Sequence, residues 1–152
     1  MGGKGIEMSA TGLEVFDTTV QKTMTWLKDI MEELHWQDRH RAYLALRGCL
    51  HQVRDRLPLE EVAHLGAQLP MLVRGIYYEG WDPTQNPTRE RTAEEFASAL
   101  IDYFPQDINL DYEGVMSGCL RVMSRHVDSG ITRHVRGAMP RSIAELWDEA
   151  PV

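Results

Sequence analysis

Apolar residues recur every three or four positions near the start of the chain. This spacing places their side chains on one face of an α-helix, because a helix completes a turn every 3.6 residues. The pattern therefore predicts an amphipathic helix over residues 13–34. The members of this apolar stripe are Leu13, Phe16, Val20, Met24, Leu27, Met31 and Leu34.

Three more helices are predicted before residue 80. Asp38 is a residue type that caps helix N-termini, and the three-to-four spacing continues after it as far as Pro58. Pro58 and Pro70 each suit the first turn of a further helix, where a backbone N–H is not needed. Gly66 and Gly80 can end these two short helices. No segment alternates apolar and polar residues as a strand would.

Residues 81–91 hold two prolines and mainly polar side chains, which predicts a connector. A new helix is predicted directly after it. The Thr92 hydroxyl is followed three residues later by the Glu95 carboxylate, which is the signature of a capping box.

The second half of the sequence matches the first at a constant offset. Gly48-Cys49-Leu50 falls on Gly118-Cys119-Leu120, and the same shift places Pro70 on Pro140. Apolar positions keep the same register, so a repeat is predicted. We interpret the two Gly-Cys-Leu segments as small residues at points where helices cross closely.

This match predicts an all-α fold: a compact helical bundle of about eight helices, built from two similar four-helix halves packed together. The halves cover residues 13–80 and 92–150 of a single domain, 13–152. The Gly-rich residues 1–12 are expected to be a flexible tail or an expression remnant. The predicted core residues are Trp26, Leu34, Leu46, Val53, Phe96, Phe104 and Trp147.

Charge and composition narrow the classes of partner. The chain has 152 residues, a net charge of −7 and a pI of about 5.3, which argues against binding nucleic acid or anionic lipid. No apolar run approaches the ~20 residues that cross a bilayer, and no secretory signal pattern is present. Two cysteines without a Cys-x-x-Cys pair favour free thiols in the cytoplasm.

Several polar residues are candidate ligand-binding groups. Arg54 and Arg56 lie at a predicted helix C-terminus, where the helix dipole favours cations. They form either an anion site or a solvated, ion-paired face. His64 lies four residues after Glu60 and can pair with it on a helix surface. A packing role is favoured for His64, and no metal site is expected.

Residues 59–79 have the outline of a helix-turn-helix. Its second helix offers one cation, Arg74, whereas a recognition helix presents polar side chains to base edges and phosphates. The segment therefore argues against DNA reading. Tyr78 and Trp81 occur only in the first half, and they either line a pocket or cover a neighbouring helix.

No Ser-His-Asp order, phosphate-binding glycine loop or dinucleotide fingerprint is present, so we expect no enzymatic activity and no cofactor. Two short sequence motifs, however, are fairly specific for one protein family. They are Arg54-Asp55-Arg56-Leu57-Pro58 and Ala67-Gln68-Leu69-Pro70. Through them, residues 13–147 resemble the bacterial family named domain of unknown function 2267. The resemblance implies a helical, bacterial, cytoplasmic protein, and it brings no activity and no catalytic residues.

Three functional hypotheses follow. The first is a non-catalytic protein-interaction or scaffold module, whose partner is another protein or a second copy in a homodimer. The second is a small-molecule or anion-binding module that uses the cleft between the halves. The third is DNA binding through residues 59–79. The candidate binding residues are Arg54, Arg56, His64, Arg74, Tyr78 and Trp81.

Overall fold

Eight α-helices and three short 3₁₀ segments form the regular structure of the computed structural model, which describes residues 10–107 and 109–148. No strand occurs in these residues, so the predicted all-α class is confirmed. The first four helices are α2 (Glu14–Leu34), α3 (Arg39–Arg56), α4 (Leu59–Ala67) and α5 (Met71–Tyr78). After η1 (Pro83–Gln85) come α6 (Ala93–Ser98), η2 (Ala99–Tyr103), α7 (Tyr112–His126), α8 (Ser129–Gly137), α9 (Arg141–Ala144) and η3 (Glu145–Trp147). The predicted 1–12 tail lies almost entirely outside the described residues.

Local signals account for where the helices begin. The Asp38 carboxylate accepts hydrogen bonds from the backbone N–H groups of His40 and Arg41, at 2.9 and 3.4 Å. Thr92 and Glu95 form the predicted capping box. These side chains satisfy backbone donors that have no partner inside the helix.

The helix bounds of the second half recur at the offset that places Gly48 on Gly118. This shift carries both ends of α4 onto the ends of α8, and the start of α5 onto the start of α9. It also places the start of α6 on Thr23, which lies in the middle of α2. Residues 14–22 of α2 therefore correspond to residues 84–92, nearly all of them in the predicted connector, where the short η1 is the only helical element. The repeat itself stays a prediction.

The core contains six of the seven predicted core residues: Trp26, Leu46, Val53, Phe96, Phe104 and Trp147. The exception is Leu34, which is only partly buried. Leu34 is the last residue of α2, and it packs at the edge of the core beside Gly118. A Cβ atom on Gly118 would lie 2.6 Å from the Leu34 Cδ2 atom.

Close crossing at the two Gly-Cys-Leu segments is confirmed. A Cβ atom on Gly48 would lie 2.5 Å from a methyl group of Leu100, so any larger residue would force this buried side chain of η2 to move. The neighbouring Cys49 and Cys119 are free, buried thiols. Hydrogen bonding to Cys119, together with burial, raises the pKa of the Cys49 thiol, which makes it a poor nucleophile.

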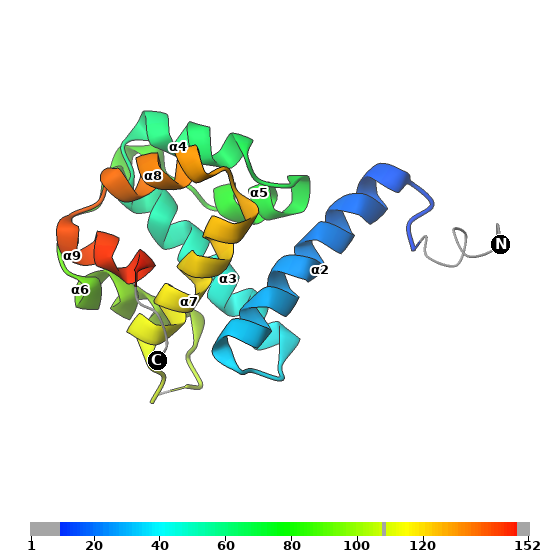
Figure 1. Ribbon diagram of the computed structural model, residues 1–152, viewed down its shortest axis with the longest axis horizontal. Helices are drawn as coiled ribbons and strands as arrows, with labels where there is room; N and C mark the ends of the chain where they lie inside the picture. The colour runs from blue at the N-terminus through cyan, green and yellow to red at the C-terminus, as the bar shows by residue number, and fades with distance from the viewer. Residues whose placement is uncertain (1–9, 108, 149–152) are drawn as a thin grey trace.

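Helix α2 is only half embedded (Figure 1). Its C-terminal part packs against α3 and α7, whereas its N-terminal part projects from the body of the molecule. Thr23 is the first buried residue of the helix. None of the described helices combines the length and apolarity that a membrane crossing requires.

Candidate interaction surface

Arg54 is buried, with all of its observed contacts inside the chain. Its Nη1 atom donates to the backbone carbonyls of Tyr77 and Glu79, both at 2.9 Å, and its Nε atom donates to the Asp55 carboxylate at 2.7 Å. These bonds attach the end of α5 to α3. The Arg54 guanidinium therefore has a structural role: it holds the end of α5 against α3.

Arg56, Trp81 and Asn86 attach the connector to the end of α3. Arg56 donates from Nε to the Glu90 carbonyl at 2.8 Å. Trp81 donates from Nε1 to the Asn86 side-chain oxygen at 2.8 Å, and the Asn86 amide donates to two carbonyls at the end of α3. The Tyr78 ring lies 5.6 Å from the Trp81 ring and packs on Gly66. Tyr78 and Trp81 thus cover neighbouring segments of the same chain.

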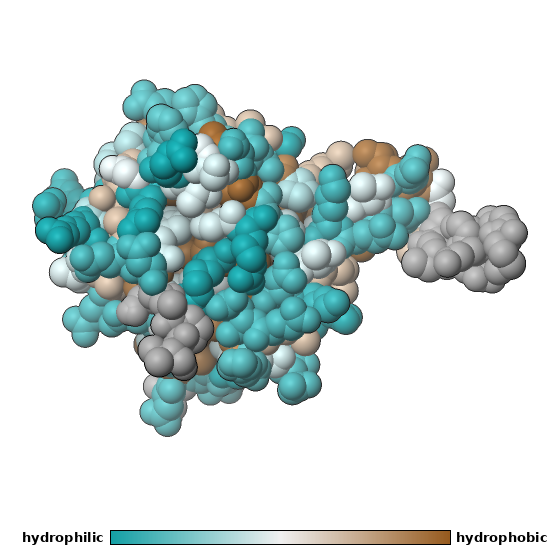
Figure 2. Space-filling model, in the orientation of Figure 1, coloured by the Kyte–Doolittle hydropathy of each residue, from teal (hydrophilic) through white to brown (hydrophobic). Residues whose placement is uncertain are grey.

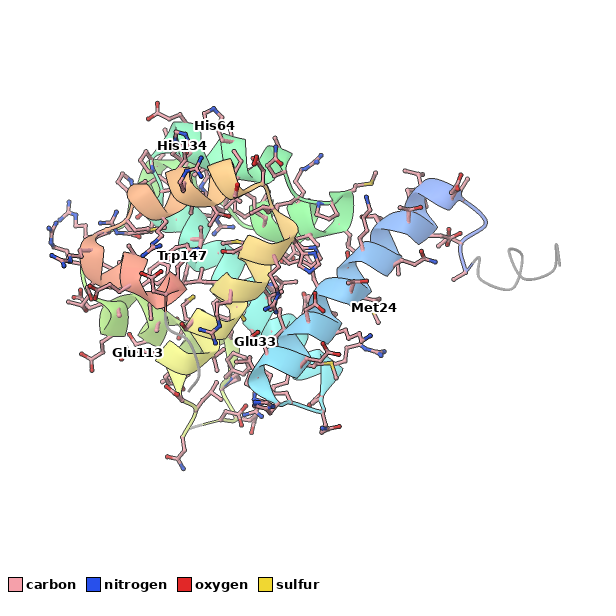
Figure 3. The ribbon with its side chains drawn as sticks, viewed as in Figure 1. Met24, Glu33, His64, Glu113, His134 and Trp147 are labelled. Carbon is pink, nitrogen blue, oxygen red and sulfur yellow. The ribbon has the colours of Figure 1, made fainter. Side chains whose placement is uncertain are left out.

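His64 is exposed, and its observed partner differs from the predicted one. Its Nδ1 atom lies 3.7 Å from the Glu61 carboxylate, three residues earlier, whereas Glu60 was the partner considered from the sequence. The His64 side chain is 63% exposed, so the packing role favoured from the sequence is wrong. On a short helix both spacings bring side chains together, and rotamers decide between them. His134 lies on the neighbouring helix α8 at the same end of the molecule (Figure 3). Among the described residues, no group of three side chains is arranged to hold a metal ion.

Arg74 closes the end of α4. It donates from Nε to the Gly66 carbonyl at 2.9 Å and from Nη2 to the Leu69 carbonyl at 2.8 Å. Arg74 also lines a hollow with a volume of about 510 Å³, which contains Lys22, Gln68 and His126 as well. None of the other five predicted binding residues lines this hollow.

A larger hollow, of about 840 Å³, lies between the two predicted halves. Glu33 of α2 enters it and pairs with Arg121 at 2.9 Å and with Arg125 at 3.1 Å. Burial raises the pKa of the Glu33 carboxyl, but the hydrogen bonds and charges of both arginines outweigh burial, and the net pKa is lowered. Asp111, Glu113 and Glu145 add further carboxylates to the lining. Four carboxylates and one arginine, Arg121, line the hollow, so its charge favours a cation over an anion. The predicted Arg54, Arg56 and Arg74 do not line it.

His51 is a buried titratable residue that the sequence did not single out. Its Nδ1 atom lies 2.8 Å from the Tyr103 hydroxyl, and its Nε2 atom lies 2.7 Å from the Ile76 carbonyl. A neutral ring satisfies both contacts if Nε2–H donates to the carbonyl and Nδ1 accepts from the hydroxyl. Burial lowers the pKa of His51 below its ordinary value of 6.5.

This lowered pKa predicts a pH-dependent stability. Above pH 6.5 the ring is neutral in both the folded and the unfolded chain, and its stabilising contribution is fully present. Below that value the unfolded chain binds the proton first, so stability falls as the pH falls through the folded pKa. We expect the free energy of unfolding to fall more steeply with acid in the wild type than in His51→Gln, measured by urea titration at several pH values. His64→Gln is the matched control for loss of an imidazole, and equal slopes for wild type and His51→Gln would contradict the assignment.

A cluster of exposed apolar side chains lies at the projecting end of α2. It comprises Leu13, Val15, Phe16, Val20, Met71 and Leu72, which are 41–54% exposed, and we call it the α2–α5 apolar face. These are six of the eight large hydrophobic residues that are exposed in the described chain, so exposed apolar surface is concentrated here. Figure 2 shows hydrophobic residues gathered at this end of α2.

Helices α2 and α5 meet at the α2–α5 apolar face. The Thr19 hydroxyl accepts a hydrogen bond from the Leu72 backbone N–H at 2.8 Å, which fixes the start of α5 against α2. Around this hydrogen bond, the six apolar side chains of the face remain exposed to solvent. Leu13, Phe16 and Val20 belong to one predicted helical stripe, and spacing alone does not separate the covered part of the stripe from the exposed part. One signal in the sequence could have made this separation. The repeat offset places the start of α6 on Thr23, yet the stripe begins ten residues earlier, at Leu13.

The fold and this surface define an all-helical domain in which helix α2 is half embedded and projects from the body. A model of the family described as "Uncharacterized conserved protein (DUF2267)" matches residues 23–146, and the chain belongs to this family. A search of curated proteins finds no match. The family match begins at Thr23, where α2 enters the core, so residues 14–22 lie outside the matched domain.

Proposed function

We propose that this protein is a non-catalytic interaction module that docks another protein surface through the α2–α5 apolar face. The exposed apolar cluster at the projecting end of α2 carries this proposal. The largest apolar patch on a monomeric protein typically covers about 300–600 Å² and is often an interaction site.

The energetics of α2 support a docking role. Burying apolar surface contributes about 25 cal/mol per Å², whereas residues 14–22 contribute no buried side chain to the core. Residues 14–22 extend the embedded part of the 21-residue helix α2 and gain little stabilisation from packing. A partner that covers the face would supply this packing. Projection from the body also leaves the face accessible (Figure 1).

A capture experiment tests the proposal. We expect the immobilised wild-type chain to retain a stoichiometric protein partner, either another protein or added free chain, and Phe16→Asp to lose it. A carboxylate in the middle of the face would have to be desolvated on docking, so binding should weaken by at least tenfold. Ile101→Asp is the matched control, because Ile101 is 53% exposed on η2, away from the face. Equal retention by wild type and Phe16→Asp would contradict the proposal.

A further inference from the structure

We propose that the α2–α5 apolar face docks on the same face of a second copy of this chain, with the two α2 helices crossing antiparallel near Phe16 and Val20. This inference rests on the proposed function and names its partner.

The apolar pattern of α2 continues from its buried C-terminal part into its exposed N-terminal part, as if each part packs against a different helix. Leu13, Phe16 and Val20 continue into Thr23, Leu27 and Ile30 with alternating steps of three and four residues. This spacing forms a seam of the kind that packs helix against helix. Thr23, Leu27 and Ile30 are buried within the molecule, whereas the first three positions are 41–52% exposed. The same seam therefore runs out of the body without a partner.

A twofold axis requires one surface to be complementary to itself. In an antiparallel crossing centred between Phe16 and Val20, the Phe16 ring of each copy lies opposite Val20 of the other. The larger ring then faces the smaller β-branched side chain twice, once on each side of the axis. Leu13 of each copy falls opposite Thr23 of the other, where α2 enters the core.

Charge and shape permit this pairing. None of the six side chains of the face is charged. The Asp17 carboxylates, one position after Phe16, flank the crossing near its axis, so their repulsion opposes pairing until salt screens it. The rest of the net charge of −7 on each chain acts at longer range, where salt screens it. Because α2 projects from the body, an antiparallel crossing places the two bodies at opposite ends of the helix pair (Figure 1).

The exposed area suits a dimer of moderate strength. Six large side chains, each about half exposed, present apolar surface on the order of 300–600 Å², the size of the largest apolar patch on a typical monomer. A standard interface buries about 800 Å² per partner, including its polar rim. If the polar flanks of α2 supply this rim, the buried area per partner reaches the lower end of the range of specific interfaces. We therefore expect a dimer that dissociates on dilution.

Sedimentation equilibrium of the full chain over a range of concentrations tests the dimer. The wild type and Ile101→Asp are expected to dimerise, whereas Phe16→Asp should be monomeric or at least tenfold weaker. Added salt should strengthen the wild-type dimer by screening the repulsion between acidic chains. Circular dichroism of Phe16→Asp checks that it is folded, which its exposed position allows. A wild type that is monomeric throughout, or a dimer insensitive to Phe16→Asp, overturns the inference.

Cysteine cross-linking tests the direction of the crossing. When Phe16→Cys and Val20→Cys chains are mixed and oxidised, the antiparallel arrangement predicts a mixed disulfide as the main product. Preferential cross-linking within Phe16→Cys alone would show a parallel pair and overturn the antiparallel arrangement. The native Cys49 and Cys119 are each 1% exposed, so they do not compete. A monomeric wild type that still captures another protein through Phe16 would leave the proposed function standing while removing the second copy as the partner.

Discussion

Replacing Arg54 with alanine is expected to lower the free energy of unfolding by about 3 kcal/mol or more. The change leaves the buried Tyr77 carbonyl without its donor, at about 1–3 kcal/mol, and it also removes the bonds to the part-buried Glu79 carbonyl and to the Asp55 carboxylate. Arg54→Lys should restore little of this, because one ammonium group cannot reproduce the fixed fork of a guanidinium. Urea denaturation measures the loss.

Arg56→Ala is the matched control for the Arg54 experiment. Arg56 is only partly buried and donates to one observed carbonyl, that of Glu90, so its loss should cost about 1 kcal/mol. If Arg54→Ala were as stable as the wild type, the structural role assigned to Arg54 would be wrong. The ligand-binding role considered from the sequence would then regain weight.

Replacing Trp26 with alanine is expected to cost about 3–5 kcal/mol, the range typical of removing a large aromatic side chain from a packed core. Trp26 is 1% exposed, and its ring is stacked on that of His126, at a centroid distance of 4.7 Å. His126 is in turn 2.7 Å from Asp29 of α2. The substitution therefore removes packing at the point where α2 meets the end of α7. Thermal and urea unfolding monitored by circular dichroism measure the change.

Trp36→Ala provides the comparison for Trp26→Ala. The Trp36 ring is only partly buried, and the Arg41 guanidinium lies 4.3 Å from its centre. Losing this exposed cation–π contact and part of the ring's packing should cost about 1 kcal/mol. Equal losses for the two tryptophans would mean that α2 and α7 are less tightly joined than the structure indicates.

Predictions from the sequence were accurate where the physical cause is local. The Asp38 cap and the Thr92–Glu95 capping box involve residues at most three positions apart, and both are present as expected. Spacing within one helix likewise identified buried positions such as Val53 and Phe96. The pairing of His64 was missed even at short range, because two spacings on one helix face compete and side-chain rotamers choose between them.

Predictions of the candidate site were limited because its residues meet through tertiary contacts. Arg54 bonds to carbonyls 23 and 25 residues away, and Glu33 pairs with Arg121, 88 residues away. A sequence pattern shows that an arginine lies at a helix end, but not that backbone carbonyls already occupy its donors. The same limit explains why the carboxylate-lined hollow around Glu33 was not anticipated.

The sequence by itself determined the all-helical class, the helix starts and most of the core, because these depend on periodicity and capping within a few residues. Only the tertiary structure decided which part of the α2 stripe is covered. Leu27 and Val20 belong to the same stripe, yet α3 and α7 reach the C-terminal part of α2 and leave Val20 41% exposed. Burial is a property of what packs against a residue, and for residues 14–22 the described chain supplies little besides the start of α5.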